Sequence, residues 1–162
     1  MLRLHVLASG SKGNASIIED TDTGSGILID CGISKKAFLD RCFDVSFDPI
    51  CITDVLITHE HSDHTKGLGV LIRGLDKIGA HPSLRTASSI KEASPDIKEA
   101  LKTEGVHFQP FENGDILNIG SVKVRPLATS HDAVESFGFR FEVDCKRTDV
   151  INPYSFTDSL TF

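Results

Sequence analysis

The chain has 162 residues, of which 40% are hydrophobic and 25% are charged, and its formal net charge at pH 7 is −6. This composition is typical of a soluble globular protein, and the length suffices for one sizeable core. The negative charge argues against a general electrostatic attraction to nucleic acid or membrane. Bound cations could still supply positive charge for a phosphate locally.

Cysteine usage and the absence of long apolar runs bear on the cellular compartment. The four cysteines form no C-x-x-C pair, which favours free thiols in a reducing cytosol over a disulfide framework. The sequence shows no signal peptide, membrane-spanning run, repeat or linker. We therefore expect one domain over residues 1–162, a cytoplasmic location and no membrane partner.

The first part of the chain predicts an antiparallel meander, followed by a helix and a further strand. Apolar, β-compatible runs alternate there with turns that contain Gly, Asn and Asp. The expected strands cover residues 2–8, 15–19, 26–30 and 52–58, and the expected helix covers residues 34–42. The turn at residues 9–14 is interpreted either as a plain hairpin turn or as a group of backbone N–H donors for an anion.

A carboxylate stands at the end of the third expected strand, where Asp30 is followed by Cys31 and Gly32. Asp30 could cap the helix that begins near Ser34, because short acidic side chains accept hydrogen bonds from helix N-termini. It could equally be a buried partner that orients a metal-binding side chain. The residues alone leave both interpretations open.

The densest group of chemically active side chains lies at residues 58–65, which read Thr-His-Glu-His-Ser-Asp-His-Thr. Imidazole and carboxylate groups together are typical ligands of Zn, Mn and Fe, and a shared cation binds imidazoles in their neutral form. His59 and His61 can converge on one ion from an extended segment, while Asp63 and His64 can turn towards a second. The alternative is a histidine-rich exposed turn.

The remainder of the chain predicts further helices and strands. A helix is expected at residues 66–79, which would place His64 just before its N-terminus. It is followed by a strand at 82–86, a helical region at 87–102 interrupted at Pro95, and strands at 106–111, 116–119, 121–127 and 136–144. The last strand carries apolar side chains at alternate positions, which indicates that it is half-buried.

The motif at residues 59–64 fits the signature H-x-H-x-D-H, and the chain resembles the metallo-β-lactamase-fold hydrolases. Residues 9–14, 28–32, 58–69 and 130–133 are similar to the WalJ/VicX (YycJ-type) subgroup, which is usually assigned as a phosphodiesterase or exonuclease. The resemblance covers roughly residues 1–144. It implies an α+β fold, namely an αββα sandwich with two sheets between two helical layers.

The resemblance also implies roles for individual residues. The metal ligands would be His59, His61 and His131 for one ion, and Asp63 and His64 for a second. Asp63 and His64 would also be catalytic, and Asp30 would support the histidine cluster. The cofactors would be Zn or Mn, with up to two divalent ions per chain. Glu60 and Ser62 fill the variable motif positions, and we expect them to face outward.

The chain departs from the family towards its end. The family has a bridging aspartate after His131, and the candidates here are Asp158, the preferred ligand, and Asp149. Neither is followed by the glycine that the family's turn carries. Residues 147–162 are unlike the family, and its final histidine has no match. We therefore expect a C-terminally truncated sandwich, lacking roughly its second half, with an incomplete second metal site.

These features predict a metal-dependent hydrolase, in which a hydroxide held by the metal ions attacks a phosphodiester of single-stranded or nicked DNA or RNA. Two alternatives follow from the same residues. The first is a thioester or lactone hydrolase of the same fold. The second is a catalytically weak metal-binding fragment that acts through oligomerisation, because a half-sandwich would leave a sheet flank exposed to form a homodimer.

Overall fold

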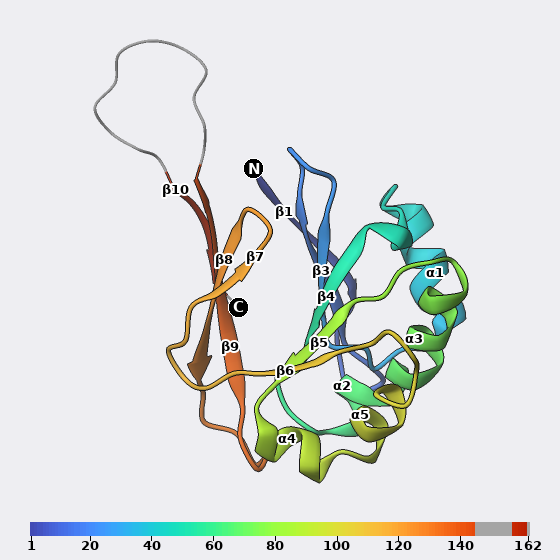
Figure 1. The fold of residues 1–162 in the computed structure, drawn as a ribbon, viewed down its shortest axis with the longest axis vertical. Helices are drawn as coiled ribbons and strands as arrows, with labels where there is room; N and C mark the ends of the chain where they lie inside the picture. Colours follow the sequence, from blue (N-terminus) through green and yellow to red (C-terminus); the bar gives the residue numbers. More distant parts are fainter. Residues whose placement is uncertain (145–156, 162) are drawn as a thin grey trace.

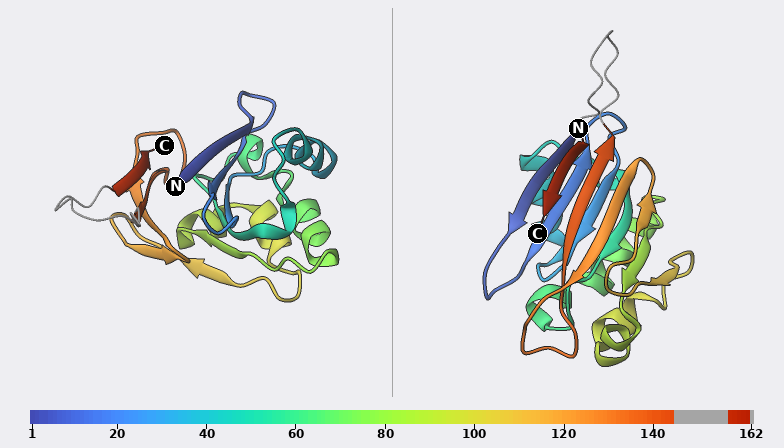
Figure 2. Two further views of the ribbon diagram at one scale, coloured as in Figure 1. Left: turned by 90° about the horizontal axis from the view of Figure 1, so that it is seen from above. Right: turned by 90° about the vertical axis from the view of Figure 1, so that its left-hand side faces the viewer.

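Two β-sheets face each other in the structure, a computed structural model that describes residues 1–144 and 157–161 (Figure 1). Helices cover the outer face of the first sheet (Figure 2). Over the described ranges, no helix covers the outer face of the second sheet. The chain thus forms a helix–sheet–sheet arrangement, which confirms the predicted fold class as an αββα sandwich without its fourth layer in this part of the chain.

The first sheet has six strands, and its order follows the chain. They are β1 (Leu2–Ala8), β2 (Ala15–Asp20), β3 (Gly26–Ile29), β4 (Ile52–Leu56), β5 (Ser83–Thr86) and β6 (Phe108–Pro110). β1 to β3 form the predicted antiparallel meander, whereas β3 to β6 run parallel. Parallel neighbours require crossover connections. Because β3 to β6 run in the same direction, their carboxyl ends meet at one edge of the sheet, where the loops after β3 and β4 lie close together.

The crossover connections carry the helices of the outer layer (Figure 1). They are α1 (Lys35–Asp44) with a short 3₁₀ turn (Pro49–Cys51), α2 (Ser62–Thr65) with α3 (Leu68–Lys77), and α4 (Ser88–Ala93) with α5 (Pro95–Ala100). A capping side chain and a proline set two of the helix boundaries. The Ser34 side chain caps α1 by accepting from the Ala37 N–H, and Pro95 separates α4 from α5 as predicted.

The second sheet contains four strands in the order β10-β9-β8-β7, all antiparallel. They are β7 (Leu117–Ile119), β8 (Val122–Ala128), β9 (Phe137–Asp144) and β10 (Thr157–Thr161). The apolar side chains of β9 that the sequence places on one face are indeed buried: Phe137, Phe139, Phe141 and Val143. They face the first sheet, and burying each large side chain contributes about 1.5–3 kcal/mol.

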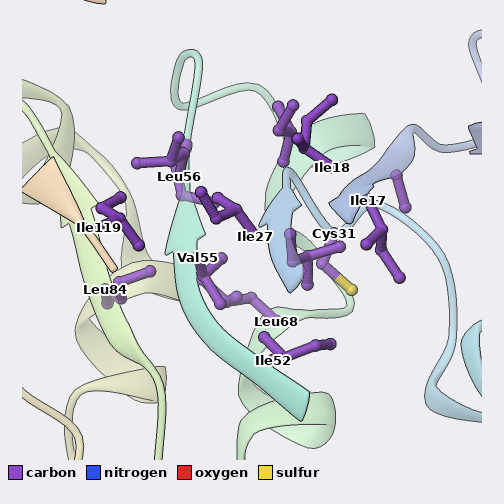
Figure 3. Packing of buried hydrophobic residues seen from close by; sticks show 14 of the residues in the cluster. Ile17, Ile18, Ile27, Cys31, Ile52, Val55, Leu56, Leu68, Leu84 and Ile119 are labelled. Atoms are coloured by element: carbon purple, nitrogen blue, oxygen red, sulfur yellow. The ribbon is translucent and has the colours of Figure 1, made fainter. Parts of the chain in front are cut away.

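The core fills the space on both sides of the first sheet (Figure 3). Ile27 and Leu56 belong to its central strands, and Leu68 packs from α3. Ile119 of the second sheet belongs to the same hydrophobic cluster. The two sheets and the helices therefore share one continuous core, which fixes the loops at the sheet edges relative to one another.

The helix expected at residues 66–79 is present as α3, but the prediction missed a short helix, α2, that precedes it. α2 ends at Thr65 and α3 starts at Leu68. Gly67 lies between them, where an added Cβ would overlap the carbonyl oxygen of Ile33. His64 consequently lies inside α2 and not before a helix. This position turns its ring towards the end of β3.

Other features of the described residues bear on compartment and partners. Cys31, Cys42 and Cys51 are free thiols, and burial raises the pKa of Cys31 and of Cys42 to about 12. Cys145 lies outside the described residues. Within the described ranges, no helix combines the length and the apolar character that crossing a membrane would require.

Candidate metal centre

Asp30 connects the end of β3 with the start of the histidine motif. Its carboxylate accepts from the Thr58 N–H over 2.8 Å, from the Thr58 hydroxyl over 2.7 Å and from Nδ1 of His64 over 2.7 Å. Asp30 is only 4% exposed and its φ is +58°. Because Ser34 caps α1 with its own hydroxyl, these contacts match the interpretation of Asp30 as a buried partner of the motif.

The hydrogen bonds of Asp30 determine which nitrogen of His59 is free. A carboxylate only accepts, so the single hydroxyl hydrogen of Thr58 points to Asp30. The Thr58 oxygen then accepts from Nδ1–H of His59, 2.8 Å away. Nε2 of His59 is left with a lone pair. It is buried and has no hydrogen-bond partner among the described residues, which is costly unless a ligand completes it.

Each of the other two imidazoles also has one ring nitrogen bonded, in both cases to Asp132. The carbonyl oxygen of Asp132 accepts from Nε2 of His61 over 3.2 Å, and its carboxylate lies 2.6 Å from Nδ1 of His131. His61 therefore keeps Nδ1 free, and His131 keeps Nε2 free. Metal-binding histidines are commonly oriented by such an acceptor on the other ring nitrogen.

The three rings converge although they come from distant parts of the chain. The ring centroids are 4.7 Å apart for His59 and His61, 4.5 Å for His59 and His131, and 5.0 Å for His61 and His131. One nitrogen of each ring lies within 4.8 Å of the others. Three converging imidazoles, one of which has an unpaired buried nitrogen, fit a divalent cation such as zinc. The donor set therefore suits the metal ion that the motif implies.

Asp63 and His64 lie beside this group but do not form an equivalent one. A carboxylate oxygen of Asp63 is 3.5 Å from Nε2 of His64. The amide nitrogen of Asn14 lies 3.3 Å from that carboxylate oxygen and 3.2 Å from the same ring nitrogen. In the part of the chain that the structure describes, three candidate metal ligands converge only at His59, His61 and His131.

Burial and neighbouring charges move the pKa values of two histidines in opposite directions. Burial lowers the pKa of His59 below its usual value, and the neighbouring His64, His131 and His61 add to this effect against the attraction of Asp30. Burial also disfavours the charged form of His64, but the hydrogen bond to Asp30 and the charges of Asp30 and Asp63 outweigh it and raise its pKa. His59 is therefore neutral, and ready to bind a metal ion, at neutral pH.

The structure does not bring Asp158 to the histidines. Asp158 pairs with Val143 in the ladder of β10 and β9. The motif, by contrast, meets β9 at its other end, where the Phe137 N–H donates to the Thr58 carbonyl over 3.0 Å. Phe137 and Val143 are six positions apart, which at the usual rise of a strand is about 20 Å. Asp149, the other candidate, lies outside the described residues.

The sequence did not predict three residues that bond the candidate ligands directly, namely Thr58, Asn14 and Asp132. It also predicted the wrong orientation for Glu60. Asp132 could have been found, because a carboxylate next to a candidate ligand is a frequent orienting partner. The expectation that Glu60 faces outward is wrong. Its Oε1 accepts from the Val134 N–H over 2.9 Å, and its Oε2 is buried.

A sandwich of this topology with three converging histidines beside its strand ends is typical of one class of metal-binding proteins. Comparison of the sequence with known families identifies that class. The chain belongs to the metallo-beta-lactamase superfamily, whose family model matches residues 8–144. Exodeoxyribonuclease WalJ of Streptococcus pneumoniae serotype 2 (strain D39) is 33% identical over 143 residues, or 87% of this chain and 50% of that protein. Exodeoxyribonuclease YycJ of Bacillus anthracis is 32% identical over 150 residues, or 93% of this chain and 53% of that protein.

The chain spans about half the length of these curated relatives. Solved structures agree on the fold. A B3 metallo-beta-lactamase with an active site glutamic acid superposes with a TM-score of 0.67 at 18% identity, covering 98% of this chain and 58% of that chain. The motif and the two exodeoxyribonuclease relatives together support the predicted resemblance to the WalJ/YycJ subgroup.

Proposed function

We propose that this chain is a metal-dependent phosphodiesterase that cleaves nucleic acid, with single-stranded or nicked DNA or RNA as substrate. The observation that carries the proposal is the convergence of three imidazoles on a place where the buried Nε2 of His59 lacks a partner among the described residues. The names of two relatives, both exodeoxyribonucleases, support the choice of a phosphodiester over other bonds.

The three histidines would hold one divalent ion, Zn or Mn, and Asp63 with His64 would contribute to a second. When bound, such ions supply a water molecule with a pKa near 7 and neutralise charge on phosphate oxygens. Imidazole and carboxylate suit both metals, so availability decides between them. The second site would be the weaker one, because Asp63 and His64 have no third converging ligand in the described ranges.

The residues of the chain itself would orient the reactants. The Asp63 side chain is 32% exposed, so its carboxylate can accept a proton from an attacking water. Nδ1 of His64 donates to the Asp30 carboxylate over 2.7 Å, so Nε2 is the nitrogen that His64 would offer to the second ion. Lys66 supplies a positive charge close by, where its Nζ donates to the carbonyl of Lys12 over 2.8 Å.

The test is hydrolysis of bis-p-nitrophenyl phosphate and of end-labelled single-stranded DNA by the purified chain, with Zn, with Mn and with a chelator. We expect turnover only with metal, and its loss in His61→Ala. His107→Ala is the matched control, because His107 is an exposed histidine outside the group. Equal metal-dependent rates for the wild type and His61→Ala would contradict the proposal.

A hydrolase of another bond is a second candidate, favoured by the likeness in fold to a metallo-beta-lactamase. The same centre could open a thioester or a lactone. A panel of such substrates, assayed beside the phosphodiesters under the same metal conditions, distinguishes the two. A higher kcat/KM for a thioester or lactone than for either phosphodiester would select this candidate.

A third candidate is a metal-binding module that acts through self-association. β1 is the outer strand of the first sheet, and its Leu4 and Val6 are 39% and 57% exposed. An edge strand with apolar side chains can pair with a second copy. Sedimentation velocity of the wild type and Val6→Lys tests it: a dimer that Val6→Lys converts to monomer, without turnover of any substrate, supports this candidate.

A further inference from the structure

Glu60 is placed between two candidate ligands, yet its side chain contacts a different part of the chain. It lies between His59 and His61 in sequence, and its Oε1 accepts from the Val134 N–H over 2.9 Å. Oε2 is buried without a hydrogen-bond partner among the residues described. A glutamate that only served solubility would turn both oxygens to water, because burying a carboxylate oxygen is costly.

The contact of Glu60 is one of three that join the motif to the segment carrying His131. The Phe137 N–H donates to the Thr58 carbonyl over 3.0 Å, and Nε2 of His61 donates to the Asp132 carbonyl over 3.2 Å. The Glu60 bond lies between these two, so residues 58, 60 and 61 face residues 137, 134 and 132 in order. The two segments therefore run antiparallel, and Glu60 provides their central connection.

Apart from these contacts, the segment that bears His131 is tied to α4 by the hydrogen bond that the Ser89 hydroxyl donates to the Glu135 carboxylate. Its base is closed by Thr129 and Ser136, which bond through their backbones over 2.8 Å and their hydroxyls over 2.9 Å. At its tip His131 and Asp132 are 40% and 88% exposed. An exposed loop of this length needs a fixed point to keep a ligand in register with two others on a rigid strand end.

We propose that Glu60 is a positioning residue, which holds the segment at residues 130–135 against the histidine motif and thereby sets the affinity of the centre for a divalent cation. The inference rests on the proposed metal centre. Glu60 does not belong to the group of three converging histidines, and it would act through His131. Loss of residues that orient metal ligands lowers metal affinity by about 10- to 100-fold, so we expect a loss in that range for Glu60→Ala.

Two further variants of Glu60 separate the reach of its side chain from its charge. Glu60→Gln keeps an oxygen at the right distance to accept from Val134, so its zinc affinity should stay close to that of the wild type. Glu60→Asp keeps the charge but is one methylene shorter, so it should behave like Glu60→Ala. Glu104→Ala is the control, because Glu104 is an exposed glutamate remote from the motif in sequence.

The experiment measures the zinc dissociation constant of each variant by competition with a chelating dye, with amide hydrogen exchange of residues 130–136 in the metal-free chain. We expect weaker zinc binding and faster exchange at Val134 in Glu60→Ala and Glu60→Asp only. In a His131→Ala background, Glu60→Ala should cause no further loss of affinity. If Glu60→Ala does not fold, the comparison of Glu60→Gln with Glu60→Asp decides.

Unchanged zinc affinity in Glu60→Asp and Glu60→Ala would overturn the inference. An equal loss in the His131→Ala background would also overturn it, since the effect would then not pass through His131. Failure of the wild type to bind zinc is a separate outcome, which removes the proposed function and the inference that rests on it.

Discussion

Each of the three converging histidines has one ring nitrogen already bonded, and the direction of these bonds leaves the other nitrogen for a cation. The arrangement originates at Asp30, whose acceptor-only carboxylate orients the Thr58 hydroxyl and, through it, the ring of His59. Asp132 does the same for His61 and His131. The chemistry of the centre is therefore set by residues that are not themselves ligands.

The first prediction concerns Asp30. Replacing it with alanine leaves the Thr58 N–H, the Thr58 hydroxyl and the His64 ring without their buried acceptor. Removing one partner of a buried ion pair typically costs about 3–5 kcal/mol, so the free energy of unfolding in urea should fall by about that amount. Asp40→Ala is the control, because solvent screens the exposed pair with Lys36 and its loss should cost far less. Similar losses in the two variants would contradict this role.

The second prediction concerns pH in the metal-free chain. His59 has a lowered pKa, so its contribution to stability is present above the usual value of 6.5 and is lost as the pH falls through the folded-state value. His64 has a raised pKa, so its contribution is present below 6.5 and is lost as the pH rises through its folded-state value. NMR titration of the ring C–H resonances should give a midpoint below 6.5 for His59 and above it for His64. The reverse order would refute this assignment.

At the scale of elements, the ends of β3 and β4 place the site, and close backbone packing holds the two ends together. The Asn14 N–H donates to the Asp63 carbonyl, and the Cys31 N–H donates to the His64 carbonyl, each over 2.8 Å. Gly32 lies in this contact, where an added Cβ would overlap the Asp63 carbonyl group. Only glycine permits that approach.

The third prediction follows from this packing. Gly32→Ala should separate the loop after β3 from α2, lower the free energy of unfolding by about 3 kcal/mol and weaken zinc binding. Gly69→Ala in α3 is the matched control, since the nearest atom to an added Cβ there is Cγ of Glu99 in α5, at an ordinary contact distance of 3.5 Å. Alanine favours a helix over glycine by about 1 kcal/mol, so the control should be neutral or stabilising. Urea denaturation of both variants distinguishes them, and an undisturbed Gly32→Ala would contradict the close approach.

The sequence allowed predictions where side-chain chemistry and local spacing agree, but it did not reveal how distant strands pair. The spacing of His59 and His61 after an apolar strand suffices to predict a shared centre, and the alternation in β9 predicts its buried face. His131 required the family resemblance, because a single histidine carries no pattern. Asp158 was misplaced because sequence order does not reveal that β10 pairs with the far half of β9. The split between α2 and α3 depends on the approach of Ile33 to Gly67, which is a tertiary contact.

For the molecule as a whole, the centre joins the two sheets. His59 and His61 follow β4 of the first sheet, whereas His131 lies between β8 and β9 of the second. A cation shared by all three would add a further connection between layers that already share the apolar core and the hydrogen bonds of residues 58–61 with residues 132–137. Metal binding should therefore stabilise the entire sandwich and not only one loop.

The fourth prediction is that zinc raises the free energy of unfolding of the whole chain. A ligand that binds only the folded state adds about 2.7 kcal/mol at a free concentration of 100 times its Kd. The gain should appear in urea denaturation of the wild type and His107→Ala, and it should be absent in His131→Ala. A gain that persists in His131→Ala would mean that zinc stabilises the chain elsewhere.

The central claim is that His59, His61 and His131 share one divalent cation, and anomalous diffraction at the zinc edge from zinc-soaked crystals tests it most directly. We expect a zinc peak between Nε2 of His59, Nδ1 of His61 and Nε2 of His131, at about 2.0–2.1 Å from each nitrogen. Zinc located only at other residues, with no peak between these three rings, would contradict it.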